Sequence, residues 1–143
     1  MLEHDMMEIG YEYLSKLPNI KIIKKEVPFL SRWIDIVMLN DLDEIISIEF
    51  KVSKWRHAIE QAINHKLGAD KAYICLPMRN ITTTLSNAIE EAGIGLLLYD
   101  ETSEIKISEA IPLKKEKSNV TAFRNILCEN MMKIWWQFLL WPK

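Results

Sequence analysis

The sequence predicts an α/β domain with a mixed sheet flanked by helices, followed by a separate helix at the C-terminal end. Three observations predict this class. Apolar residues recur at helical spacing in several segments, runs of aliphatic residues lie between them, and turn residues separate the runs. The length of 143 residues suits one domain, and a composition of 49% hydrophobic and 27% charged residues is that of a globular chain.

The first half of the chain predicts a helix and then a three-stranded meander. Residues 7, 11, 14 and 17 are apolar at spacings of three and four, and Pro18 ends the pattern, which indicates an amphipathic helix. Three β-like runs follow, separated by Pro28 and by the turn-like residues 40–43. The predicted strands cover residues 20–27, 33–39 and 44–52.

The second half alternates helices and strands. A helix over residues 54–67 is predicted from the apolar residues on one of its faces, and Gly68 provides a stop. The next predicted elements are a strand over residues 71–76, a helix over 81–92, and strands over 94–99 and 104–111. Because a strand that follows a helix returns by a crossover, this alternation predicts parallel pairing in the later part of the sheet.

The C-terminal segment differs from the rest of the chain. After Pro112 comes a lysine-rich linker, and then a strongly apolar stretch over residues 119–141 predicts a helix. This stretch contains Trp135, Trp136 and Trp141, but its apolar runs are shorter than the roughly 20 residues of a membrane span. No association with a membrane is therefore expected.

The chain divides accordingly into a domain over residues 1–112 and a second part over residues 113–143, which holds the linker and the tail helix. Exposed aromatic area of this size favours aggregation unless it is covered. We therefore expect the tail helix to pack on the core or on a partner subunit, and the expected assembly is a homodimer.

Charge, cysteine content and the N-terminus limit the class of protein. A formal net charge of −2 is unlike that of a generic basic DNA-binding module, although residues 51–71 carry a local excess of lysine and arginine. Cys75 and Cys128 lie far apart, which indicates neither a disulfide framework nor a cysteine metal site. The first residues lack the features of a secretion signal, so the expected location is the cytoplasm.

Asp35, Glu49 and Lys51 are the residues whose types and spacing indicate chemistry. Asp35 is the only charge inside an apolar predicted strand, where an ionised carboxylate is costly unless it is paired or bound to a metal. Side chains alternate along a strand, so Glu49 and Lys51 lie on the same side of theirs. If the two strands pair, Asp35 lies roughly 5 Å from one of these residues across the ladder.

Two carboxylates beside a lysine suit metal-assisted hydrolysis. Carboxylate oxygens are hard ligands that bind Mg²⁺, and Mn²⁺ accepts the same ligands. Such a metal activates a bound water and neutralises charge that develops on a phosphate, while the lysine orients or deprotonates the water. The predicted reaction is phosphodiester hydrolysis. The competing interpretation is a structural ion pair between Asp35 and Lys51 on an α/β scaffold.

These residues also resemble a known motif. Asp35, a strand end and turn, and then Glu49, Phe50 and Lys51 are similar to the PD-(D/E)XK motif of the restriction-endonuclease-like superfamily. The order of elements from residue 6 to residue 76, about half of the chain, resembles the αβββαβ core of that superfamily. The resemblance implies Asp35, Glu49 and the main-chain carbonyl of Phe50 as metal ligands, and Lys51 as the catalytic lysine. Ile34 stands where the motif has proline, which many members also lack.

The resemblance implies further site residues on two helices. Many members complete the metal site with a glutamate of the first helix, for which Glu8 is the better match and Glu12, one turn away, is the alternative. Gln61 and His65 are similar to the Gln-x-x-x-Tyr helix motif of RecB-like nucleases, with histidine in place of tyrosine. Glu8, Gln61 and His65 can equally be read as solvated helix residues.

Two more residues, Lys54 and Arg56, are candidates for contacts with nucleic-acid phosphates, although a basic run after a strand is usually just solvated. The expected function is a Mg²⁺-dependent nuclease acting on DNA, in repair, recombination or defence. The alternative is a non-catalytic module of the same fold that binds nucleic acid or a protein partner. A third interpretation is an interaction protein that uses the tryptophan-rich tail. The sequence does not distinguish DNA from RNA.

Overall fold

The computed structural model describes residues 1–114 and 119–140, and the side chains of 134–140 are not described. In chain order the elements are α1 (Glu3–Ser15), β1 (Ile20–Phe29), β2 (Arg32–Asn40), β3 (Ile45–Phe50), α2 (Trp55–His65), β4 (Lys71–Pro77), α3 (Thr83–Ala92), β5 (Gly95–Tyr99), β6 (Ile107–Ile111) and α4 (Thr121–Leu140). The predicted α/β class and the predicted order of helices and strands are confirmed.

The strands form one mixed sheet of six strands in the order β1-β2-β3-β4-β5-β6. The meander β1-β2-β3 is antiparallel, β3, β4 and β5 are parallel, and β6 returns antiparallel to β5. The helices α2 and α3 make the two crossovers that parallel pairing requires. The sheet therefore combines the predicted hairpins of the first half with the predicted crossovers of the second.

The last strand begins later than the sequence predicts, at Ile107 rather than at residue 104. Residues between β5 and β6 form a turn instead, in which the Asp100 carboxylate accepts hydrogen bonds from the N–H and the hydroxyl of Thr102. Aspartate competes with strand pairing in this way because its short side chain reaches the backbone two residues on.

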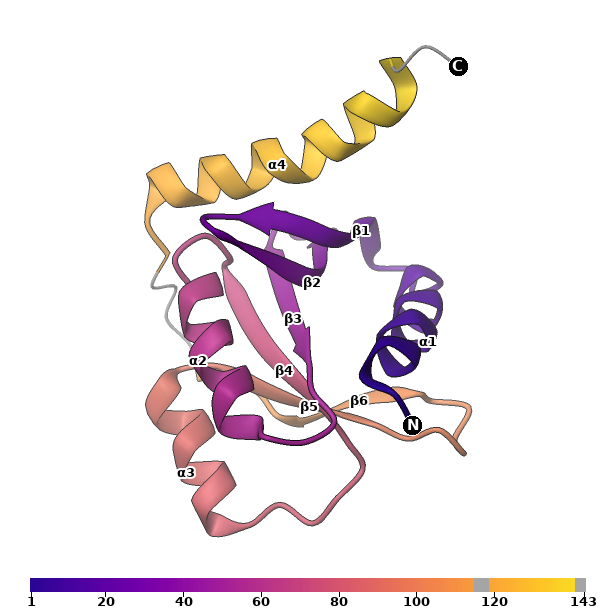
Figure 1. The fold of residues 1–143 in the computed structure, drawn as a ribbon, viewed down its shortest axis with the longest axis vertical. Helices are drawn as coiled ribbons and strands as arrows, with labels where there is room; N and C mark the ends of the chain where they lie inside the picture. Colours follow the sequence, from indigo (N-terminus) through magenta and orange to yellow (C-terminus); the bar gives the residue numbers. More distant parts are fainter. Residues whose placement is uncertain (115–118, 141–143) are drawn as a thin grey trace.

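Helices cover both faces of the sheet (Figure 1). On one face α1 packs on a core formed mainly by β2, β3 and β4, and on the other face α2 and α3 pack on β4 and β5. Gly10 of α1 allows close approach, because a Cβ at this position would lie 3.0 Å from the ring of Phe50. The α1 helix is thereby held against the end of β3, where the candidate site lies.

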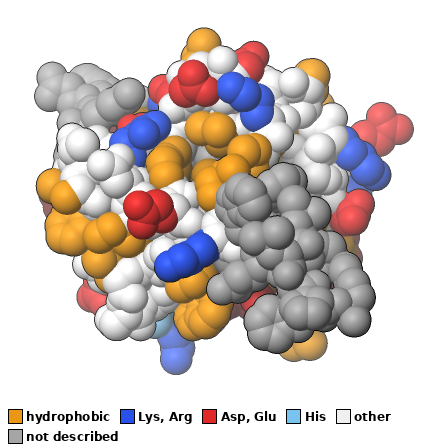
Figure 2. Space-filling view, turned by 90° about the horizontal axis from the view of Figure 1, so that it is seen from above, with side chains coloured by type: hydrophobic (Ala, Val, Ile, Leu, Met, Phe, Trp, Pro, Cys, Tyr) orange, Lys and Arg blue, Asp and Glu red, His pale blue; other side chains and the backbone are white. Residues whose placement is uncertain are grey.

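The helix α4 lies across the β1–β2 end of the sheet (Figure 1), where Leu127 and Met131 are buried against Val27 and Phe29. Seen from the side of α4, hydrophobic side chains gather among charged ones (Figure 2). The predicted linker residues 115–118 and Trp141 lie outside the described residues, as do the side chains of Trp135 and Trp136. The homodimer therefore stays a prediction.

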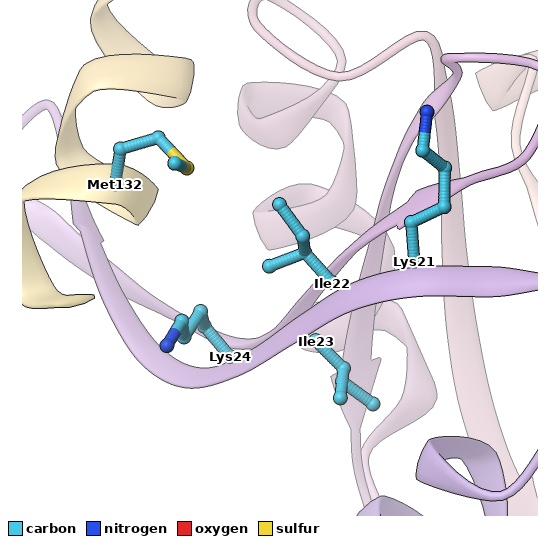
Figure 3. Close-up of a pocket in the computed structure, with 5 residues that line it drawn as sticks. All are labelled: Lys21, Ile22, Ile23, Lys24 and Met132. Atoms are coloured by element: carbon cyan, nitrogen blue, oxygen red, sulfur yellow. The ribbon is translucent and has the colours of Figure 1, made fainter.

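A groove of about 360 Å³ separates β1 from α4 and is lined by Lys21, Ile22, Ile23, Lys24 and Met132 (Figure 3). The Lys21 ammonium is held by Asp43 at 2.9 Å, and the floor is aliphatic. The groove brings together no acid and no metal ligand, so it is not the place where the predicted chemistry would occur.

Two further features of the described residues are the hydropathy of the helices and the state of the cysteines. In the described ranges, 1–114 and 119–140, no helix combines the length and apolar character needed to cross a membrane. Cys75 and Cys128 are both free thiols.

Candidate active site

The end of the β2–β3 ladder is the centre of the candidate site. The ladder runs antiparallel up to the pair Ile36 and Ile48. Beyond this pair, the N–H of Phe50 donates to Oδ2 of Asp35 at 2.8 Å. A carboxylate thus accepts the hydrogen bond at the position where the backbone pairing stops, which fixes Asp35 beside the end of β3.

Glu49 lies opposite Asp35, one position beyond the last ladder pair. Its side chain is only 5% exposed, and its Oε1 atom has no hydrogen-bond partner among the described residues. Burial raises the pKa of the Glu49 carboxyl, and the neighbouring charge of Asp35 raises it further. A buried acceptor without a donor costs free energy, so this arrangement is explained best by a group that the site is built to bind.

Lys51 follows directly on β3 and is anchored by its backbone, whose N–H donates to the carbonyl of Cys75 at 3.0 Å. Its side chain is 19% exposed, and its Nζ lies 3.9 Å from Oε1 of Glu3. The charge of Lys51 lowers the pKa values of both Asp35 and Glu49, which places the ammonium near the two carboxylates. The structure therefore brings the three predicted catalytic residues together.

A small cavity of about 180 Å³ opens beside Asp35 and is lined by Glu3, His4, Met7, Glu26 and Asp35. Burial raises the pKa of the Asp35 carboxyl, the hydrogen bond from Phe50 opposes this, and the charges of Glu3 and Glu26 raise the pKa further. Glu26 has a left-handed backbone, with φ of 52°, within β1. The cavity is acidic, so it would attract cations and repel anions.

Glu3 was not among the predicted site residues. The predicted ligand Glu8 is bound instead by Lys25 at 3.0 Å, and the alternative, Glu12, lies 4.0 Å from Lys16 on the exposed side of α1. Glu3 could have been found from its spacing, because it lies four residues before Met7 and hence on the same helix face. This spacing argument requires α1 to begin at Glu3, and the sequence analysis did not predict so early a start.

The four residues predicted to contact nucleic acid, on α2 and just before it, differ in exposure. Lys54, just before α2, is exposed, and the Arg56 guanidinium lies 4.3 Å from the centre of the Trp55 ring. Gln61 is half-buried, and its Oε1 has no partner among the described residues, while His65 is only 2% exposed. Lys54 and Arg56 are thus available to a large ligand, whereas His65 faces the interior.

The carboxylates of Asp35 and Glu49 form the donor set that Mg²⁺ would meet in this site. Within the described part of the chain, no group of three or more His, Cys, Asp or Glu side chains is arranged to hold a metal ion. Asp35 and Glu49 nevertheless fit a hard cation that keeps several waters, because Mg²⁺ is commonly bound by one or two carboxylates. The unpartnered Oε1 of Glu49 is the observation that supports this fit.

Comparison with solved structures shows the same fold in other proteins. A protein of unknown function from Silicibacter pomeroyi superposes with a TM-score of 0.66 at 17% identity, over 97% of this chain and 90% of that one. A repair endonuclease from Pyrococcus abyssi gives a TM-score of 0.50 at 17% identity, over 67% of this chain. The EndoMS–dsDNA complex gives 0.52 at 18% identity, over 71% of this chain.

The two endonucleases are larger, since this chain matches 46% of the length of each. No family model matches the sequence, and no curated protein matches it either. At identities of 17 to 18% the likeness concerns the fold. The fold is therefore nuclease-like.

Proposed function

We propose that this protein is a metal-dependent nuclease that hydrolyses phosphodiester bonds of DNA. The observation that carries the proposal is the pairing of Asp35 with Glu49 at the end of β3. One carboxylate is fixed by the Phe50 N–H, and the other keeps a buried oxygen for which the described part of the chain offers no partner. Lys51 lies beside both. This combination suits metal binding next to a reacting phosphate.

Each residue has a role that its position supports. Asp35 and Glu49 would hold Mg²⁺ or Mn²⁺, with the main-chain carbonyl of Phe50 and Glu3 or Glu8 as further ligand candidates. The bound metal would supply an acidified water and neutralise charge on the phosphate. Lys51 would orient that water through its N–H donors as an ammonium, and could take up the proton of the water only as the neutral amine. Burial of Glu49 excludes bulk solvent, which strengthens the electrostatic contribution of every charge in the site.

DNA is the substrate that the fold likeness favours. One of the similar structures is a repair endonuclease, and another was solved with double-stranded DNA. The exposed cations Lys54 and Arg56 lie at the start of α2, just after β3, and would contact the phosphates, although the net charge of −2 limits non-specific attraction. Parallel assays with RNA decide between the two nucleic acids.

A second candidate function is a non-catalytic module that binds nucleic acid or a protein. The observation in its favour is that no group of three His, Cys, Asp or Glu side chains is gathered for a metal in the described ranges. Such a module would keep the fold and the cation contacts of Lys54 and Arg56 without turnover.

The test is a plasmid-nicking assay with Mg²⁺ or Mn²⁺ and an EDTA control. We expect metal-dependent nicking that is lost in Asp35→Asn and in Lys51→Ala. Asn at position 35 keeps an oxygen acceptor for the Phe50 N–H, so that variant should fold. The matched control is Lys16→Ala, whose exposed side chain lies at the C-terminal end of α1.

Nicking that persists in both Asp35→Asn and Lys51→Ala would refute the assignment of the site. No cleavage of DNA or RNA, together with salt-sensitive binding of either one, would favour the binding module. Absence of both cleavage and binding would leave the interaction protein as the remaining function.

A further inference from the structure

A second cavity lies between the tip of the β1–β2 hairpin and the end of α2. Its volume is about 140 Å³, and it is lined by Phe29, Leu30, Ser31, Arg32, Asn64 and His65. None of the residues at the Asp35 cavity lines it. It is therefore a separate candidate binding site on the same domain.

His65 is the observation that points to a ligand. The side chain is 2% exposed, and neither Nδ1 nor Nε2 has a hydrogen-bond partner among the described residues. Buried polar groups in folded proteins are almost always satisfied, and leaving one unpaired costs about 1 to 3 kcal/mol. Because His65 lines the cavity, a ligand that reached the imidazole from there would satisfy it.

The chemistry of the cavity favours an uncharged polar ligand. Burial and, to a smaller extent, the charge of Arg32 together lower the pKa of His65 to about 4, so the imidazole is neutral at pH 7 and offers one donor and one acceptor. Phe29 and Leu30 supply apolar walls, and Ser31 with Asn64 supply groups that both donate and accept. An anion site would instead gather several cations around a charged imidazole.

A nucleobase matches this set of groups. Its edges present donors and acceptors side by side, and its faces are apolar enough to lie against Phe29 and Leu30. The Arg32 guanidinium lies on the lining and can stack on the base or contact the phosphate of the same nucleotide. Ligand pockets in proteins commonly combine apolar walls with a few such polar groups.

The hairpin carries a second, independent feature. Leu30 is 48% exposed and Trp33 is 63% exposed, although both are large apolar side chains. Proteins that displace a base from the nucleic-acid stack use exposed apolar side chains of this kind as wedges. Trp33 and Asp35 lie two residues apart on β2, so the exposed hairpin is close in the chain to the candidate active site.

We propose that the cavity between the β1–β2 hairpin and the end of α2 binds one unpaired nucleobase of the nucleic acid through His65 and Asn64. The proposal rests on the proposed nuclease function for the identity of the macromolecule. Its consequence is a preference for substrates with an unstacked or mismatched base, because the cost of extruding such a base is smallest.

The test observes His65 directly by NMR of the imidazole nitrogens in the full chain, in EDTA, so that cleavage plays no part. The chain has three histidines, and His57 is exposed on the same helix, which provides an internal control. The probes are deoxyadenosine, deoxycytidine and thymidine, and separately inorganic phosphate. We expect a saturable shift of the His65 signals with at least one nucleoside, no shift with phosphate, and constant His57 signals.

Two outcomes overturn the proposal. A His65 shift with phosphate alone would make the cavity an anion site, and equal or absent shifts at His65 and His57 with every probe would mean that no base binds there. Folding is not in question in either case, because the free chain gives the reference spectrum.

A second measurement uses variants and a single-stranded oligonucleotide that contains 2-aminopurine. We expect His65→Leu to weaken binding roughly tenfold, the loss of about one hydrogen bond, whereas His57→Leu leaves binding unchanged. His65→Leu should fold, since it removes two unpartnered nitrogens. Base binding without plasmid nicking would refute the proposed nuclease activity and leave the base site intact. Plasmid nicking without base binding would refute only the base site.

Discussion

Glu49 faces Asp35 across the end of the β2–β3 ladder, one position beyond the pair Ile36 and Ile48. The Asp35 carboxylate accepts the Phe50 N–H at 2.8 Å, whereas Oε1 of Glu49 lacks a partner among the described residues. Two carboxylates so placed repel each other, and burial strengthens the repulsion. The metal-free site is therefore expected to lower the stability of the fold.

The first prediction follows from this repulsion. Glu49→Gln should raise the free energy of unfolding of the metal-free protein at neutral pH by on the order of 1 kcal/mol, because a neutral amide avoids the burial and the repulsion by Asp35 that raise the pKa of the Glu49 carboxyl. Thermal melting in EDTA measures this. Mg²⁺ should raise the melting temperature of the wild-type chain and have little effect on the variant. A variant that is less stable in EDTA, with an unchanged Mg²⁺ response, would mean that Glu49 is structural.

The second prediction concerns the acid that α1 contributes. Glu3→Gln should weaken Mg²⁺-dependent nicking roughly tenfold, because Glu3 lines the Asp35 cavity and lies 3.9 Å from Lys51. The comparison variant is Glu8→Gln, which changes the competing ligand candidate and removes the acid that faces Lys25 and His4. Rates are to be measured over a range of Mg²⁺ concentrations. A loss in Glu8→Gln and none in Glu3→Gln would restore the residue that the sequence analysis preferred.

The third prediction concerns the contact that joins α4 to the sheet. Asp70 accepts hydrogen bonds from the N–H of Ile45, from Asn119 and from Arg124. Burial by itself would raise the pKa of Asp70, but these hydrogen bonds outweigh it and hold the pKa below its ordinary value of 3.8. The stabilising contribution of Asp70 is therefore complete at neutral pH and is lost as the pH falls below about 4.

Asp70→Asn should accordingly cost about 3 kcal/mol of stability at pH 7 and less at pH 3, because the contact involves a buried charge. Denaturant unfolding at the two pH values measures the difference. Asp43→Asn is the control, since the ion pair of Asp43 with Lys21 is exposed and should contribute little. An equal loss at both pH values would show that the charge of Asp70 does not matter.

The fourth prediction is a pH dependence that arises from His65. Its pKa in the folded chain is lowered from 6.5 to about 4, mainly by burial, so the unfolded chain binds a proton first as the pH falls. Stability should be complete above pH 6.5 and decrease towards pH 4, by at most about 3 kcal/mol. His65→Leu should reduce the change in the free energy of unfolding between pH 6.5 and pH 4, and His57→Leu should not. An equal change in the wild-type chain and in both variants would contradict the assignment of this pH dependence to His65.

The order of elements could be predicted from the sequence because the signals are local. Alternating apolar residues, turn residues and glycine stops decide where a strand or a helix can form, and neighbours in sequence carry that information. The pairing of β2 with β3 followed from the short turn between them. Asp35, Glu49 and Lys51 could be brought together on these grounds alone, since a charge within an apolar strand is conspicuous without any structure.

The sequence by itself thus determined the nuclease-like arrangement of strands and the acid pair at its centre, and tertiary packing decided which residues surround that pair. Gly10 allows α1 to approach Phe50, and the packed helix presents Glu3, rather than Glu8, to the cavity. His65 is buried by a hairpin that lies far from it in the chain. Local periodicity contains no information about the rotation of a helix against a sheet or about contacts between distant segments, which is the physical reason for the difference.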